Sequence, residues 1–183
     1  MTTRAADRSV NISPMGPIVD AELRRFTLRP YRTSRTYQNL KRTGEGVFHV
    51  TDDVELLAQA AIGQPDPLPR LFPATAVDGE IIAAACRWYA VRVASLDDSQ
   101  ERTEIVVDVV DSGRLRDFCG FNRAKFAVVE AAILATRVRL LPAADIYAQF
   151  ERLRMLVDKT GDAPEHRAFE LLERYVRSTA PQA

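Results

Sequence analysis

The stretch of this chain best suited to bind a ligand is rich in cations and hydroxyls and has no carboxylate. From Leu23 to Gly44 there is no acidic residue, although the whole 183-residue chain balances 25 Lys and Arg against 25 Asp and Glu. Seven basic residues lie in this stretch: Arg24, Arg25, Arg29, Arg32, Arg35, Lys41 and Arg42. Guanidinium groups, hydroxyls and the backbone N–H groups of a helix start are good donors to a phosphate. The stretch therefore predicts a phosphate-binding site, with a solvated basic surface as the alternative.

A short helix is expected inside the basic stretch. Ser34 is a natural N-cap, and Gly44 lies just past the expected end. Arg32 and Arg35 flank the cap, so their side chains and the first-turn amides could converge on one anion. A nucleic-acid groove is not predicted, because the basic patch is compact and the rest of the chain compensates its charge.

A second place in the sequence puts cations at a helix start. A helix is expected to begin near Asn122, with Arg123 and Lys125 in its first turn. The partial positive charge of a helix N-terminus disfavours cations there unless an anion is present. This pattern again indicates an anionic ligand, and the alternative is that both side chains extend into solvent.

A third candidate is the turn "NISPMG", residues 11–16. Pro14 makes it rigid, Met15 carries a soft thioether, and Gly16 allows close approach of the backbone. Such a turn suits one face of a flat ring. An ordinary structural turn is the alternative.

Two types of element must position these residues. β-like runs over 26–30, 46–51, 80–96 and 102–113 fill the first part of the chain, with a short helix over 54–63 capped by Asp52 or Asp53. Helical periodicity follows over 121–140, over 143–161 and after Pro164. We therefore predict an α+β protein with a β-rich body over 1–120 and a three-helix extension over 121–183 packed on it.

Several classes of protein are not indicated. Cys86 and Cys119 form no CxxC pair, and with only two histidines no metal-ligand spacing can be assembled. No segment resembles a signal peptide or reaches the length of a membrane span. We expect a cytoplasmic protein without a metal, and without nucleic acid or membrane as partner.

The three candidate regions together resemble a known family. "VNISPMGPIVD", "RPYRTSRTYQNLKRTGEGVFHVTDD" and "GFNRAKFAVVEAAILATR" are similar to an uncharacterised flavin-reductase-like family, domain of unknown function 447. The resemblance covers nearly the whole chain. It implies an FMN-binding split β-barrel, antiparallel, with a helical extension. A looser similarity to flavin reductases in general rests on "NISPMG" and on Ser34-x-Thr36-x-x-Asn39.

The resemblance also implies a cofactor and its ligands. Residues Arg32, Thr33, Ser34, Thr36 and Asn39, next to Arg35, would hold the phosphate and ribityl chain of FMN, and the turn at Pro14, Met15 and Gly16 would lie near the flavin ring. The resemblance further implies a flavin near a homodimer interface. From the cations at the helix start, and not from the resemblance, we expect Arg123 and Lys125 to complete the site from either subunit. Relatives have a strand before the segment "TTRAADRSVN". Here we expect either a shortened first strand or a start upstream of Met1.

The leading hypothesis for function is an FMN-dependent oxidoreductase or flavin reductase that uses NAD(P)H or another reductant. No second catalytic constellation is present, and we expect a structural role for His49. One alternative is a non-catalytic FMN carrier or binding module. Another is a protein of pterin and one-carbon chemistry that uses the same cleft.

Overall fold

The computed structural model describes residues 1–180, which form two compact units. The first comprises Met1–Thr51 and Pro69–Asp117, and the second comprises Asp52–Leu68 and Phe118 onward. The last three residues of the predicted extension, 181–183, lie outside the described residues. The two units therefore part close to residue 120, but the segment 52–68, which we expected within the β-rich body, clusters with the helices.

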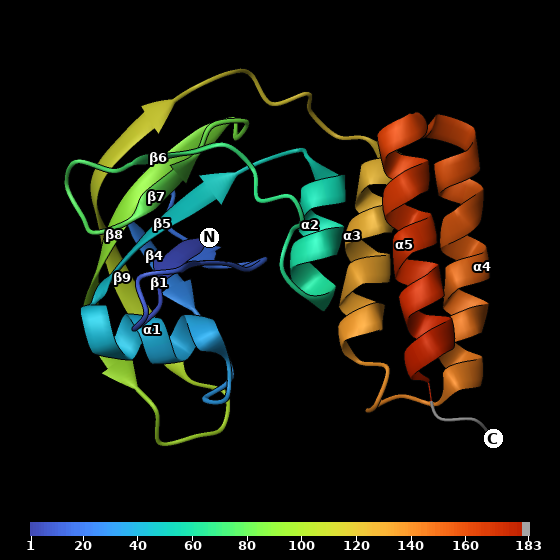
Figure 1. Ribbon diagram of the computed structural model, residues 1–183, viewed down its shortest axis with the longest axis horizontal. Coiled ribbons are helices and arrows are strands. Elements are labelled where there is room, and N and C mark those ends of the chain that lie inside the picture. Colours follow the sequence, from blue (N-terminus) through green and yellow to red (C-terminus); the bar gives the residue numbers. More distant parts are fainter. Residues whose placement is uncertain (181–183) are drawn as a thin grey trace. The chain divides into compact units, whose positions relative to one another are not determined.

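The first unit is built on an antiparallel sheet of seven strands (Figure 1). In chain order the strands of this unit are β1 (Thr2–Arg4), β2 (Val10–Ile12), β3 (Ile18–Val19), β4 (Arg25–Leu28), β5 (Glu45–Val50), β6 (Leu71–Pro73), β7 (Glu80–Ile82), β8 (Arg87–Asp97) and β9 (Glu104–Arg114). The seven-stranded sheet has the order β2-β1-β5-β8-β9-β4-β3, and β6 and β7 form a separate pair. Helix α1 (Arg35–Thr43) packs against β1.

Strand alternation explains the core of the first unit. Phe26 and Leu28 of β4 pair with Val107 and Ile105 of β9, and all four side chains are buried on one face of the sheet. The ring of Phe26 makes an edge contact with Tyr89 at a centroid distance of 5.4 Å. Tyr37 and Leu40 of α1 belong to the same cluster, so the helix closes this core.

The two long strands expected over 80–96 and 102–113 are confirmed as an antiparallel pair, the second over almost its whole length and the first only in its later part. β8 and β9 pair from Arg87 opposite Arg114 to Asp97 opposite Glu104. The predicted continuous strand over 80–96 was wrong, because Glu80–Ile82 forms β7 and pairs with β6 instead. A turn in which the Ala85 N–H donates to the Ile82 carbonyl separates the two strands.

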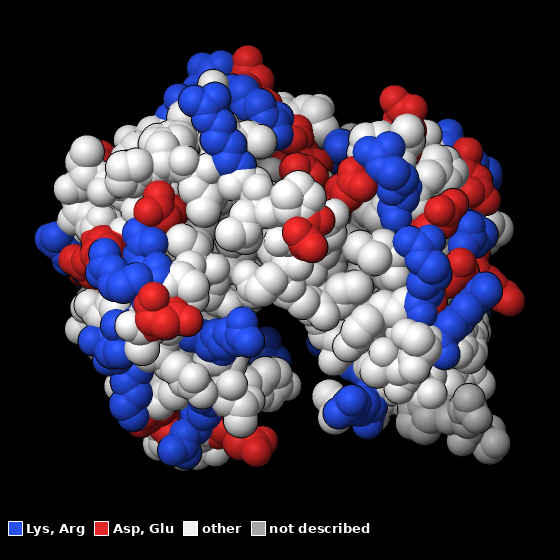
Figure 2. Space-filling view, viewed as in Figure 1, with Lys and Arg blue, Asp and Glu red and all other residues white. Residues whose placement is uncertain are grey.

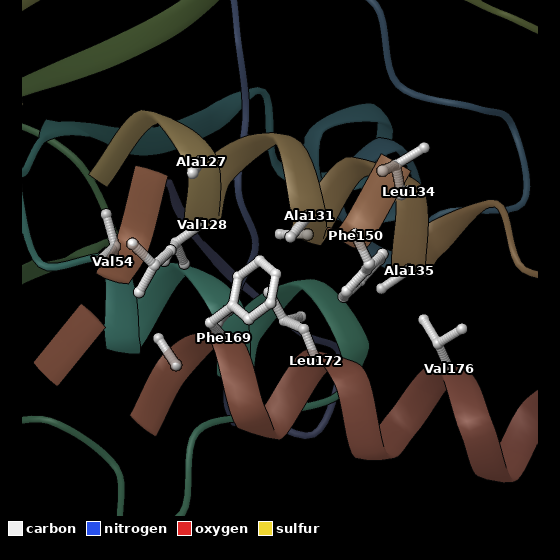
Figure 3. Close-up of a cluster of buried hydrophobic side chains, with 14 of the residues drawn as sticks. Val54, Ala127, Val128, Ala131, Leu134, Ala135, Phe150, Phe169, Leu172 and Val176 are labelled. Carbon is white, nitrogen blue, oxygen red and sulfur yellow. The ribbon is translucent and has the colours of Figure 1, made fainter. Parts of the chain in front are cut away.

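The second unit is a helical bundle with four helices. They are α2 (Val54–Ile62), α3 (Arg123–Thr136), α4 (Ala143–Thr160) and α5 (Ala163–Thr179). Figure 3 shows the buried side chains that hold them together: Phe169 and Leu172 of α5 lie between the alanine-rich face of α3 and α2, which contributes Val54. The rings of Phe150 and Phe169 lie 5.3 Å apart. The three helices predicted after residue 120 are therefore confirmed, and α2 is their fourth partner.

Small side chains decide which face of α3 is buried. The large apolar side chains of α3 are not all buried, because Phe126 is 58% and Ile133 38% exposed. The buried face instead carries Ala127 and Ala131, whose methyl groups allow neighbouring helices to approach closely. Within the described residues, no helix combines the length and the apolar character that crossing a membrane requires.

Candidate functional site

The N-terminus of α1 is built as the sequence predicted. Ser34 is the N-cap in extended conformation, and its Oγ accepts a hydrogen bond from the Tyr37 N–H at 3.2 Å. Gly44 closes the helix in the left-handed region at φ 69°. The first turn holds no acidic side chain. The backbone N–H groups of Arg35 and Thr36 have no intrahelical acceptor at this position, so the helix start carries partial positive charge.

Tertiary contacts occupy more than half of the basic side chains in this stretch. Figure 2 shows basic side chains over α1 with acidic side chains among them. Four of the seven cations have partners: Arg25 with Asp108 at 2.7 Å, Arg29 with Glu104 at 3.7 Å, Lys41 with Asp98 at 2.6 Å, and Arg42 with the Arg4 carbonyl. Within residues 1–180, the exposed side chains of Arg32 and Arg35 make no hydrogen bond or ion pair. Their charges act only at longer range, on Asp98 and Asp7 respectively. The two arginines that flank the cap therefore keep their donors available.

The loop between β8 and β9 holds this segment in place. The Tyr37 hydroxyl donates to Asp98 Oδ2 at 2.5 Å, and the Arg32 N–H donates to the Glu101 carbonyl at 2.9 Å. Hydrogen bonds from Lys41 and Tyr37 lower the pKa of Asp98 to about 2. The carboxylate of Asp98 therefore stays ionised and ties α1 to the loop.

Thr36 and Asn39 point away from solvent, although the resemblance implies that they hold the flavin. Thr36 is 2% and Asn39 6% exposed. The Asn39 amide donates to Thr3 Oγ1 at 3.0 Å, and Thr36 Oγ1 accepts from the Asn11 amide at 3.2 Å. Both side chains are thus bound to the β1–β2 hairpin. Thr33, in contrast, is exposed beside the cap.

The turn predicted over 11–16 is wrong in its first part, because Asn11 and Ile12 belong to β2, and only residues 13–16 follow the strand. Met15 packs partly against the core cluster that contains Phe26. Gly16 is exposed, and beyond Gly16 and its two chain neighbours no protein atom lies within 4 Å of the position that its Cβ would occupy. The space beside Gly16 is therefore open to a ligand, and Pro14 lies half-buried next to it.

Lys125 has its anion within the helical unit. Its Nζ donates to Glu165 Oε1 at 2.6 Å and to the Asp52 carbonyl at 2.9 Å. Burial alone would lower the pKa of Lys125, but the hydrogen bond to Glu165 holds it above its ordinary value. Asn122 caps α3 as predicted, accepting from the Lys125 N–H at 3.0 Å. The anion predicted near the start of α3 is therefore the Glu165 carboxylate of α5. Arg123, the other cation of this first turn, is exposed.

The sequence analysis missed Thr3 and placed Asn11 in a turn, whereas the two residues meet as a pair across β1 and β2. A signal was present, because "TTR" and "VNI" read as two short strands around a charged turn, with a polar residue in the middle of each. His49 is buried, and its Nε2 accepts from the Ile82 N–H at 3.1 Å. Burial sets the pKa of His49 well below its ordinary value, so this side chain is neutral and structural, as expected. Among the residues that the structure describes, no group of His, Cys, Asp and Glu side chains could hold a metal ion.

Comparison with known proteins places the chain by sequence and by fold. The family model described as "Protein of unknown function (DUF447) N-terminal domain" matches residues 1–116, and the model "Protein of unknown function (DUF447)" matches residues 122–174. An FMN-bound DUF447 protein from Methanosarcina mazei has a TM-score of 0.78 at 20% identity, over 95% of this chain and 91% of its own. No curated protein sequence matches the chain.

Two further solved structures share part of the fold. A flavin reductase domain protein from Arthrobacter sp. FB24 has a TM-score of 0.51 at 17% identity, over 63% of this chain and 75% of its own. The 2-nitrobenzoate 2-nitroreductase from Pseudomonas fluorescens has a TM-score of 0.51 at 14% identity, over 62% of this chain and 61% of its own. The predicted flavin-reductase-like α+β fold is therefore confirmed.

Proposed function

Since this chain belongs to the DUF447 family, we propose that it binds FMN and acts as a flavin-dependent oxidoreductase or flavin reductase. The observation that carries the proposal is the N-terminus of α1, where Arg32 and Arg35 are exposed and unpaired within the described residues beside the Ser34 cap. The family member from Methanosarcina mazei is FMN-bound, which supports the choice of cofactor.

The donors at this helix start fit a phosphate. Two guanidinium groups, the Thr33 hydroxyl and the free first-turn amides match the oxygens of a phosphate monoester in number and charge. We assign Arg32, Thr33, Ser34 and Arg35 to the phosphate, and the turn at Pro14, Met15 and Gly16 to the flavin ring. Bound FMN would supply hydride and electron transfer, while the chain supplies binding and orientation.

The first experiment is a visible absorption spectrum of the purified protein, before and after addition of FMN and removal of the excess. We expect about one flavin per chain. NADH and NADPH are then added separately without oxygen. Bleaching of the flavin band supports a reductase, whereas retained flavin that neither nucleotide reduces supports a carrier. A protein that does not retain FMN would refute the cofactor assignment.

The phosphate site is tested by Arg32→Ala combined with Ser34→Ala. Each charge-assisted hydrogen bond contributes about 1.5–3 kcal/mol, so FMN affinity should fall about tenfold or more for each bond lost. Arg24→Ala is the matched control, because Arg24 is an exposed arginine of the same basic stretch that lies outside the proposed site. Equal affinities of the double variant and the control would place the phosphate elsewhere.

The proposal includes a homodimer in the cytoplasm. Light scattering should then give twice the chain mass of 20.5 kDa. Cys86 and Cys119 form no disulfide within the described residues, which supports a reducing compartment. In a dimer, exposed Arg123 is available to a flavin near the interface. Lys125 would have to leave Glu165 to reach the flavin.

A further inference from the structure

We infer that Thr3 and Asn11 of the β1–β2 hairpin are positioning residues for the phosphate site, and that Thr36 and Asn39 act with them and not as flavin ligands. The inference rests on the proposed function, because it concerns how α1 is oriented toward the phosphate. Its basis is a network of four polar side chains between the hairpin and the helix.

The four side chains are linked in a buried chain of hydrogen bonds. Thr3 Oγ1 accepts from the Asn39 amide at 3.0 Å and from the Asn11 amide at 3.3 Å. The Asn11 amide also donates to Thr36 Oγ1 at 3.2 Å. The exposed fractions are 2% for Thr3 and Thr36 and 6% for Asn11 and Asn39. Buried polar groups are costly unless they are paired, so these side chains hold one arrangement.

The network sets the rotation of α1 about its own axis. Thr36 and Asn39 are three residues apart and therefore share one side of the helix. Tyr37 and Leu40, one position further on, pack into the apolar core on the adjacent side. A helix held by polar contacts on one side and apolar contacts on the other can neither roll nor slide without breaking one set.

This rotation decides where the anion donors point. Thr36 is the second residue of α1, so its side chain is bound to Asn11 while its backbone N–H belongs to the free first turn. Arg35 precedes it on the exposed side of the helix. A network that fixes Thr36 thus also fixes the amides and the arginine that would meet the phosphate, although Thr3 and Asn11 themselves lie in the sheet.

The test compares FMN with riboflavin, which lacks only the phosphate. Thr3→Val keeps the shape of the side chain and removes the acceptor, whereas Thr3→Ser keeps the hydroxyl. We expect Thr3→Val to lower FMN affinity about tenfold and riboflavin affinity less than about twofold, measured by flavin fluorescence. Thr3→Ser should stay within about twofold of the unmodified protein for both ligands. Asn11→Ala is the second variant, should Thr3→Val not fold, and the same ratio is expected.

The outcomes separate the inference from the function on which it rests. A role in stability alone would lower the affinities for both flavins together, and that result would overturn the inference. Unchanged affinity for both flavins in folded Thr3→Val and Asn11→Ala would overturn it as well, while leaving FMN binding intact. An unmodified protein that binds neither flavin would instead refute the proposed function and remove the basis of the inference.

Discussion

Replacing Lys125 with methionine separates a structural role from a role in flavin binding. The Lys125 side chain is 26% exposed, and that of its partner Glu165 is 6% exposed. Glu165 also accepts from the Asp162 N–H at 2.9 Å, as part of the capping box of α5. Lys125→Met keeps the apolar stem of the side chain and removes the charge. It therefore leaves the Glu165 carboxylate buried with one donor.

The expected cost follows from this burial. Removing one partner of a buried ion pair destabilises by about 3–5 kcal/mol, because the remaining charge is uncompensated. Since the lysine keeps some contact with water, we expect a loss near the lower end, ~3 kcal/mol in the free energy of unfolding at pH 7. Adding Glu165→Gln to Lys125→Met should recover part of the loss, because no buried charge then remains.

The assay is urea unfolding of the flavin-free protein, followed by helical circular dichroism. Arg123→Met is the matched control, because Arg123 lies in the same first turn and is exposed. In the unmodified protein, burial would raise the pKa of Glu165, but Lys125 and the Asp162 N–H hold it below 4.5. The ion pair therefore contributes its full stability above about pH 4.5, the ordinary value for glutamate. In Lys125→Met burial raises the pKa of Glu165, so the carboxylate takes up a proton more readily and the deficit should shrink as the pH is lowered from 7.

A loss in Lys125→Met no larger than that in Arg123→Met would refute this reasoning. If the same variant instead lost FMN affinity at unchanged stability, Lys125 would be a flavin ligand, as the cations at this helix start predicted. A large loss of stability with normal FMN affinity in the folded fraction would assign Lys125 to the helical bundle alone.

Three further outcomes are expected. In Gly113→Ala the new Cβ would lie 2.5 Å from Trp88 Nε1, so the indole ring must move. We expect the free energy of unfolding in urea to fall by about 1–3 kcal/mol. The fluorescence emission of Trp88, the single tryptophan, should shift. Unchanged emission would contradict the contact. The pKa of Asp98 is lowered from 3.8 to about 2 by Lys41 and Tyr37, so its contribution to stability is present above about pH 4 and is lost as the pH falls toward 2. Asp98→Asn should flatten the pH dependence of the urea midpoint in that window, and an unchanged slope would show that the carboxylate does not tie down the loop. The Phe169 side chain is 1% exposed, so Phe169→Ala should lower the free energy of unfolding by about 3–5 kcal/mol in the same assay. A decrease below about 1 kcal/mol would mean that the bundle repacks around the smaller side chain.

Local signals in the sequence predicted the helix boundaries. Ser34, Asp53 and Asn122 each cap a helix by accepting from a backbone N–H three residues later. Gly44 ends α1 in the left-handed region that glycine tolerates. These contacts join residues that are neighbours in the chain, so residue type and spacing determine them. The pairing of β8 with β9 is similar, because a short loop joins two alternating strands.

The sequence by itself also determined that the stretch around Ser34 would offer cations to an anion. It did not determine which cations stay available. Asp98, Asp108 and Glu104 are far along the chain from their partners, so the composition of the basic stretch says nothing about them. Only the folded sheet brings these acids to Arg25, Arg29 and Lys41 and leaves Arg32 and Arg35 unpaired among the described residues.

Tertiary structure likewise decided the roles of Thr36, Asn39, Lys125 and the helix α2. The apolar side chains of α2 must pack against another element, and many helices or strands could serve. In the structure they pack with side chains of α3 and α5. A polar side chain on a helix can turn to a ligand or to a neighbour, and the choice depends on what lies opposite. Thr3, Asn11 and Glu165 come from distant parts of the chain, and their positions follow from the packing of whole elements and not from local spacing.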